Sequence, residues 1–174
     1  MILAEQKKQE NIIEYILYIW QIEDIIRANN LDINKIDKLI IKDYQVNEQK
    51  KQDIKDWYIS IINDLKSNNN ETSGHCFLTN DLISELNDLH NSLKTSDIKY
   101  KEIYSWALSP INEFKEKSKI SDNNEVLISL NALYAILLLK LKRKALNPET
   151  EHAVKNISNL LGYLALRYKN LKNK

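Results

Sequence analysis

The stretch ENIIEYILYIWQIEDIIRANNLD, Glu10–Asp32, decides the fold class. One stripe at helical spacing consists of Ile12, Ile16, Ile19, Glu23 and Ile26, and a second consists of Tyr15, Tyr18, Ile22 and Ile25. Only a narrow edge, through Glu14, Gln21 and Asp24, is fully polar. A helix that is apolar on most of its circumference is typically buried among other helices. The stretch therefore predicts a buried helix over residues 5–29.

Six further segments have helical periodicity, and none has a convincing strand pattern. They cover residues 33–45, 48–66, 81–94, 98–119, 123–144 and 147–174. The expected N-caps are Asp32, Asn47, Asn80, Ser121 with Asp122, and Asn147. The sequence predicts an all-α, up-down helical bundle of about seven helices, with the helices near 5–29 and 123–144 central. We expect a single domain over residues 1–174 with an internal loop at 67–79.

Glycine and proline are scarce, with two of each in 174 residues. Gly74 and Gly162 are too far apart to form the glycine-rich loops that hold nucleotides or the GxSxG turn of hydrolases. Pro110 predicts a kink or break near Ser109, because proline disrupts a helix interior. Gly162 falls inside the last predicted helix, where we expect a close helix crossing.

Charge and cysteine content bound the partners and the compartment. Lys and Arg number 25 against 24 Asp and Glu, a formal net charge of +1, so no nucleic acid partner is expected. The single Cys76 cannot form an internal disulfide, and a cytoplasmic location is expected. The longest apolar stretch, residues 126–141, is too short and too polar to cross a bilayer, so no membrane partner is expected. No motif requires a cofactor.

Glu23, Asp24 and Arg27 lie within one turn of the first predicted helix, among isoleucines. His90 lies near the apolar stripe of the predicted 81–94 helix. A buried carboxylate must be paired, because an unpaired buried charge costs several kcal/mol. One interpretation is an ion pair that fixes the packing of the first helix. The other is an interior polar cluster of Glu23, Asp24, Arg27 and His90 that lines a ligand cavity.

Three weaker signals have a structural and a functional interpretation. Gly74 and His75, beside Cys76, form a candidate loop site or an ordinary surface loop. Glu149-x-x-His152 has the ExxH spacing of di-iron bundles, but only one such motif is present, so no metal site is expected. The basic end of the 123–144 helix matches a helix dipole, or else forms a patch that binds anions or nucleic acid. That basic end consists of Lys140, Lys142, Arg143 and Lys144.

Tyrosine and tryptophan, with nine and three residues, outnumber two phenylalanines. Such residues suit half-buried positions and are enriched at protein interfaces, although they also pack in cores. The candidate interface residues are Trp20, Trp57, Tyr104 and Trp106.

Five strings along nearly the whole chain resemble a family of small all-helical Bacteroidetes proteins described as a domain of unknown function. The strings are ENIIEYILYIWQIEDIIRANNLD (Glu10–Asp32), SGHCFL (Ser73–Leu78), LNDLHNSL (Leu86–Leu93), NALYAILLLKLKRK (Asn131–Lys144) and NPETEHAVKNIS (Asn147–Ser158). The resemblance implies a whole-chain helical domain from a bacterium with low-GC DNA. It assigns no activity to the chain. It draws attention to family-like positions that can share a polar pocket: Trp20, Gln21, Glu23, Asp24, Arg27, Gly74, His75 and His90.

Two functions follow as hypotheses. The first is a non-enzymatic cytoplasmic protein that associates with a protein partner or with itself, because catalytic motifs are missing and Tyr and Trp are frequent. The second is a ligand-binding or enzymatic bundle with a polar cavity around Glu23 and Arg27.

Overall fold

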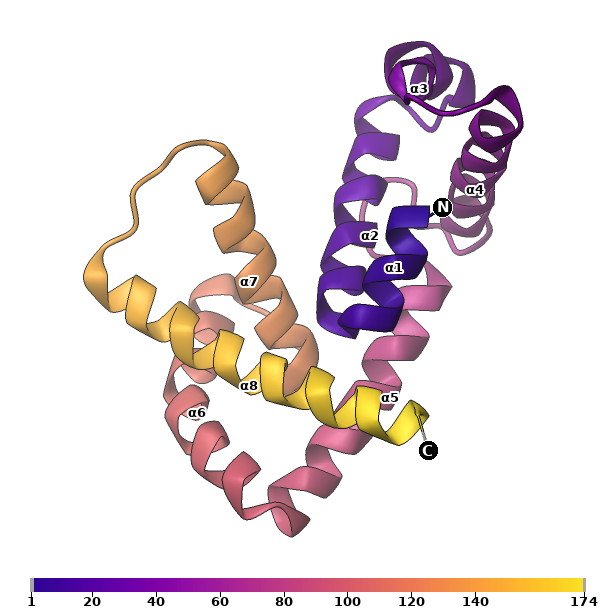
Figure 1. Ribbon diagram of the computed structural model, residues 1–174. Helices are drawn as coiled ribbons and strands as arrows, with labels where there is room; N and C mark the ends of the chain where they lie inside the picture. The colour runs from indigo at the N-terminus through magenta and orange to yellow at the C-terminus, as the bar shows by residue number, and fades with distance from the viewer. Residues whose placement is uncertain (1, 174) are drawn as a thin grey trace. The chain divides into compact units, whose positions relative to one another are not determined.

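The computed structural model describes residues 2–173 of the chain (Figure 1). These residues form eight α-helices and one short 3-10 helix, and no strand occurs among them. The all-α class predicted from the helical periodicity is confirmed. No helix within residues 2–173 combines the length and the apolar character that a membrane span requires.

The chain divides into two compact units. The first contains the chain up to Glu10 together with Glu14–Asp81, and the second contains Asn11–Ile13 together with the chain from Leu82 onward. The later boundary falls inside helix α5, Phe77–Ser96. Whether the chain behaves as one domain, as the sequence predicts, stays a prediction.

The first unit is built from α1, Ile2–Glu10; most of α2, Ile12–Ala28; α3, Ile33–Leu39; the 3-10 helix η1, Ile41–Asp43; and α4, Glu48–Ser67. The predicted 5–29 helix is thus two helices that meet at Asn11. The Asn11 side chain accepts a hydrogen bond from the Ile13 amide at 3.0 Å, and this bond lies at the start of α2. Asp32 and Asn47 cap α3 and α4 as predicted, by accepting from Asn34 N and Lys50 N.

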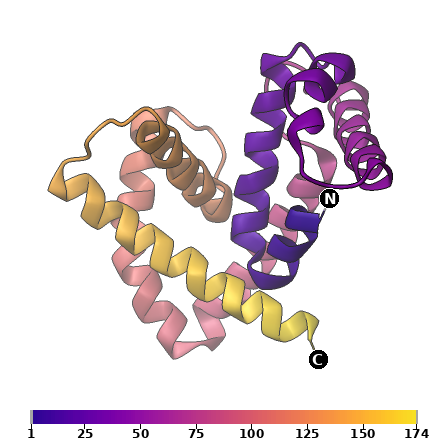
Figure 2. The same ribbon diagram turned by 45° about the horizontal axis from the view of Figure 1, so that its top comes forward.

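The second unit is built from most of α5, with α6, Ile98–Ser118; α7, Glu125–Leu141; and α8, Pro148–Lys172. Figures 1 and 2 show α8 lying across α6 and α7, and these three helices contact one another. Helix α6 runs through Pro110 without a break. Asn147 caps α8 as predicted. The expected caps Asn80 and Ser121 with Asp122 are wrong, since α5 begins at Phe77 and Asn124 caps α7.

Burial differs between the two helices that the sequence predicts to be central. Along α2, nine side chains are buried, including Trp20, Glu23 and Ile26. Along α7, burial is confined to the segment from Val126 to Ala132. Residues 133–139 are all half-buried, and Leu141 is 65% exposed. Helix α7 is therefore buried only along its first half, and the central position expected for the 123–144 helix stays a prediction.

Candidate functional site

Glu23 joins α2 to the loop that follows α4. Its side chain is fully buried, and each carboxylate oxygen has a donor from that loop. Oε2 lies 2.7 Å from His75 Nδ1, and Oε1 accepts a hydrogen bond from the Cys76 amide at 2.8 Å. Because a carboxylate accepts, Nδ1 of His75 carries the proton in this contact. The buried acid is thus satisfied by residues more than 50 positions away, namely 52 and 53.

Arg27 ties the same loop down from the next turn of α2. Its Nη2 donates to two backbone carbonyls, those of Asn70 at 3.1 Å and Gly74 at 2.5 Å. Its Nη1 lies 3.9 Å from Glu23 and 3.5 Å from Asp24. Arg27 Nε is buried and donates no hydrogen bond within residues 2–173. The predicted Glu23–Arg27 ion pair is present, but the guanidinium makes closer contacts with the loop than with Glu23.

Gly74 gives the loop a conformation that other residues rarely adopt. Its φ is +85°, and a Cβ at this position would lie 2.5 Å from Asn70 Oδ1. The Asn70 side chain in turn donates to the His75 carbonyl at 2.8 Å. The His75 ring stacks on Trp20, with ring centroids 3.9 Å apart and an interplanar angle of 9°. We call Trp20, Glu23, Arg27, Asn70, Gly74 and His75 the loop anchor.

Cys76 follows the loop anchor and is 2% exposed. Burial raises the pKa of its thiol to about 11, and the nearby Glu23 carboxylate acts in the same direction. Its Sγ lies 3.5 Å from Thr79 Oγ1. A neutral, enclosed thiol is a poor nucleophile at physiological pH. The environment of Cys76 therefore suits packing in the interior better than nucleophilic catalysis.

A second polar cluster lies in the second unit and centres on Glu125, at the start of α7. The carboxylate accepts from His90 Nε2 at 2.7 Å, from Lys94 Nζ at 2.8 Å and from Tyr104 OH at 2.7 Å. The hydrogen bond from His90 is the main reason that the Glu125 pKa falls to about 2, with Lys94 and Tyr104 adding to the effect. Three side-chain donors thus hold one carboxylate in its charged form.

His90 links Glu125 to a buried tyrosine. Its Nδ1 lies 2.6 Å from Tyr100 OH, and both side chains are buried. Because Nε2 donates to Glu125, a neutral His90 has its acceptor at Nδ1, and Tyr100 OH donates to it. Burial, and next the nearby Glu125 charge, raise the pKa of Tyr100 well above its usual range. We call His90, Lys94, Tyr100, Tyr104 and Glu125 the Glu125 cluster.

The structure brings some predicted site residues together and separates others. Glu23 and Arg27 join Gly74 and His75 in one cluster. The residue patterns alone give two sites, and only the family resemblance groups them. His90 belongs instead to the Glu125 cluster, in the other unit. Asp24 is exposed on α2. Sequence reasoning missed Glu125 as a site residue, since 35 positions separate it from His90 and no motif connects them.

The four residues of the candidate aromatic interface have different environments. Trp20 is buried against His75, and Tyr104 donates to Glu125. Trp57 is half-buried, and its ring lies edge to face with that of Tyr58, with the ring centroids 5.2 Å apart. Trp106 alone among the four is largely exposed, at 65%.

Within residues 2–173, no group of three or more His, Cys, Asp or Glu side chains is placed to hold a metal ion. Glu149 and His152, which carry the ExxH spacing, are exposed in the first turn of α8. The basic end of α7 is also exposed, at Lys140, Lys142, Arg143 and Lys144.

Comparison with known proteins gives a family and nothing more specific. The family described as Domain of unknown function (DUF4924) matches residues 1–174, and the chain belongs to it. No curated protein and no solved structure matches the chain.

Proposed function

We propose that this DUF4924 member is a non-enzymatic cytoplasmic protein of a Bacteroidetes bacterium that acts by associating with further copies of itself. The contact surface is the second half of α7, residues 133–141. The observation that supports it is the run of seven consecutive half-exposed residues at 133–139, none of them charged, followed by Leu141 at 65% exposure.

The sequence of this run is LYAILLL, so apolar groups cover the helix on every side. A helix that is apolar all round is stable in water only where other protein surrounds it. The neighbouring helices of the unit bury the first half of α7 and leave the second half partly open. Contiguous exposed apolar surface of this kind is typical of protein contact sites.

The hydrogen bonding of the two polar clusters favours a structural role over a catalytic one. Both oxygens of Glu23 accept from the chain's own loop, and Glu125 accepts three side-chain hydrogen bonds. Such satisfied networks fix local structure and leave few groups to bind a ligand. A ligand cavity around Glu23 and Arg27 stays the alternative proposal, and the buried Nε of Arg27 is the observation in its favour.

The test is the oligomeric state of wild type and of Leu141→Glu, measured by sedimentation velocity over a range of concentrations. Wild type is expected to form dimers or larger species. Leu141→Glu places a charge in the contact and is expected to weaken association at least about tenfold, which corresponds to about 1.4 kcal/mol.

The matched control is Leu166→Glu, which alters another exposed leucine, 52% exposed, on a helix of the same unit. It should associate as wild type does. Circular dichroism melting of both variants is expected to match that of wild type, which checks that folding is unaffected. A wild type that stays monomeric at every concentration would overturn the proposal.

A further inference from the structure

The net charge of +1 conceals a strong asymmetry between the two units. The first unit has ten Lys and Arg against fourteen Asp and Glu, a formal charge of −4. The second has fifteen Lys and Arg against ten Asp and Glu, a formal charge of +5. Surfaces of opposite charge attract and steer one another during association. The first unit of one copy is thus electrostatically suited to the second unit of another copy.

The positive charge is concentrated beside the apolar half of α7. Lys140, Lys142, Arg143 and Lys144 are all exposed and directly follow residues 133–139. Leu137, Leu138 and Leu141 share one side of the helix, because residues three and four positions apart are neighbours on a helical surface. The end of α7 therefore presents an apolar side together with a basic tip.

A groove in the first unit has the complementary character. Its volume is about 750 Å³, and it lies between α1, the segment after η1 and α4. Its apolar lining residues are Leu3, Tyr44, Val46 and Ile54, and its charged lining residues are Glu5, Asp53 and Lys50. The groove thus combines apolar side chains with two acids and one base, and it lies in a unit with an excess of acids.

We propose that this groove receives the end of α7 from a second copy of the chain. The proposal rests on the proposed function and names the surface that α7 contacts. An apolar helix face laid into an apolar groove is a common recognition mode. Here Leu137, Leu138 and Leu141 enter the groove, and the basic tip lies near Glu5 and Asp53. Each copy carries one groove and one α7, so each copy can take part in one contact with its α7 and in another with its groove.

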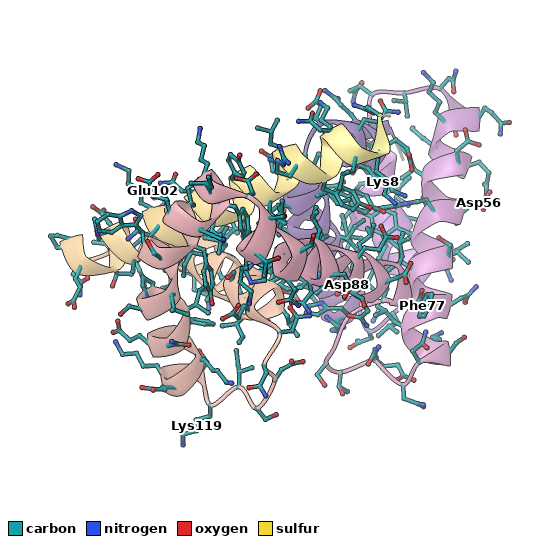
Figure 3. All side chains as sticks on the ribbon, turned by 90° about the horizontal axis from the view of Figure 1, so that it is seen from below. Lys8, Asp56, Phe77, Asp88, Glu102 and Lys119 are labelled. Carbon is teal, nitrogen blue, oxygen red and sulfur yellow. The ribbon has the colours of Figure 1, made fainter. Side chains whose placement is uncertain are left out.

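Three variants separate the two sides of the contact. Leu141→Glu alters α7, and the double variant Glu5→Lys with Asp53→Lys alters the groove. Asp56→Lys is the matched control, because Asp56 also lies exposed on α4 but does not line the groove. Asp53 and Asp56 each accept a hydrogen bond from the glutamine four residues earlier. Figure 3 shows Asp56 extending from the outer side of α4.

Sedimentation velocity of each variant alone and of their mixture forms the test. The α7 variant alone and the groove variant alone are each expected to associate at least about tenfold more weakly than wild type. In the equimolar mixture, an unaltered α7 from the groove variant meets an unaltered groove on the α7 variant. A mixed dimer with one intact contact is therefore expected, at an affinity above that of either variant alone.

Salt provides an independent readout on wild type. Raising the salt concentration from about 0.1 M to about 1 M shortens the Debye length from about 10 Å to about 3 Å. The wild-type dimer is expected to weaken over this range, and the Asp56→Lys dimer should weaken to the same extent.

The failures of the two proposals are distinguishable. If Leu141→Glu is monomeric while the groove variant still dimerises and the mixture forms no mixed dimer, α7 pairs with another surface. The proposed function then stands and this inference is overturned. If wild type is monomeric, both are overturned. A monomeric wild type that sediments with anionic lipid vesicles would assign the basic apolar end of α7 to a lipid surface instead.

Discussion

At the scale of single residues, two glutamates of the interior are stabilised in different ways. Glu23 accepts from a backbone amide and a histidine of one loop, and Glu125 accepts from three side chains on α5 and α6. Removing a carboxylate from water costs free energy unless hydrogen bonds replace those made by water. Each cluster therefore stabilises the fold only while its acid keeps its donors.

The lowered pKa of Glu125 predicts how the stability of the folded protein changes at low pH. Its pKa is about 2 in the folded protein against a reference value of 4.5. A lowered folded pKa contributes stability that is complete above pH 4.5 and is lost as the pH falls toward 2. The unfolding free energy of Glu125→Gln should therefore change less steeply across this window than that of wild type. Urea unfolding at a series of pH values measures both slopes.

The control for the acid titration is Glu102→Gln, an exposed acid on α6 that Figure 3 shows at the surface. Its slope should equal that of wild type. Some slope remains in Glu125→Gln, because the backbone hydrogen bond from Tyr100 lowers the pKa of Asp97 as well. Equal slopes in Glu125→Gln and wild type would show that the Glu125 cluster does not hold the charged form.

At the scale of helices, the sequence predicts where helices exist better than where they start. Periodicity identifies every long apolar stripe. Helix starts depend on partners that periodicity does not contain. The first amides of α5 show why: Phe77 N donates to Asp64 on α4, and Cys76 N, just before the helix, donates to Glu23 on α2. Two distant carboxylates thus replace the local cap expected at Asn80.

The same limit applies to the candidate sites. The residue patterns identify Glu23 and Arg27 as a buried pair and Gly74 and His75 as a separate loop. Their union depends on hydrogen bonds that span between 43 and 53 positions. His90 is predicted to be an interior polar residue, and it is buried, but its partners are set by the packing of α6 and α7. The spacing of the residues along the sequence carries no signal for such pairings.

Gly162 lies in α8, where the structure shows no need for glycine. The close helix crossing expected there is wrong, since a Cβ at Gly162 would meet no atom within 4 Å. Alanine has a higher helix propensity, so Gly162→Ala should raise the unfolding free energy by about 0.5–1 kcal/mol. Thermal and urea unfolding followed by circular dichroism measure the gain.

The opposite substitution provides the control for Gly162. Gly74→Ala should destabilise the protein, because Gly74 has a φ of +85° and a Cβ there would clash with Asn70. A loss of stability in Gly162→Ala would indicate that the position meets a neighbour.

At the scale of the whole molecule, each of the two compact units contains one of the two polar clusters. The loop anchor lies entirely in the first unit and the Glu125 cluster entirely in the second. The opposite charges of the units follow the same division. Each unit thus has its own polar network, so that damage to one network is expected to act mainly within its own unit.

Hydrogen exchange of Glu23→Gln tests this expectation. The glutamine amide cannot replace both acceptor oxygens, so the variant should lose about 2–3 kcal/mol of stability. Amides of residues 14–81 that exchange by unfolding of the first unit should then exchange roughly 30- to 150-fold faster, and those of residues 82–173 should change little. The control is Asp24→Asn, an exposed acid one residue along α2, whose effect should stay within about 0.5 kcal/mol. Equal acceleration in both ranges would instead show one cooperative domain over the chain, as the sequence predicts, with α5 coupling the anchored loop to the helices that follow it.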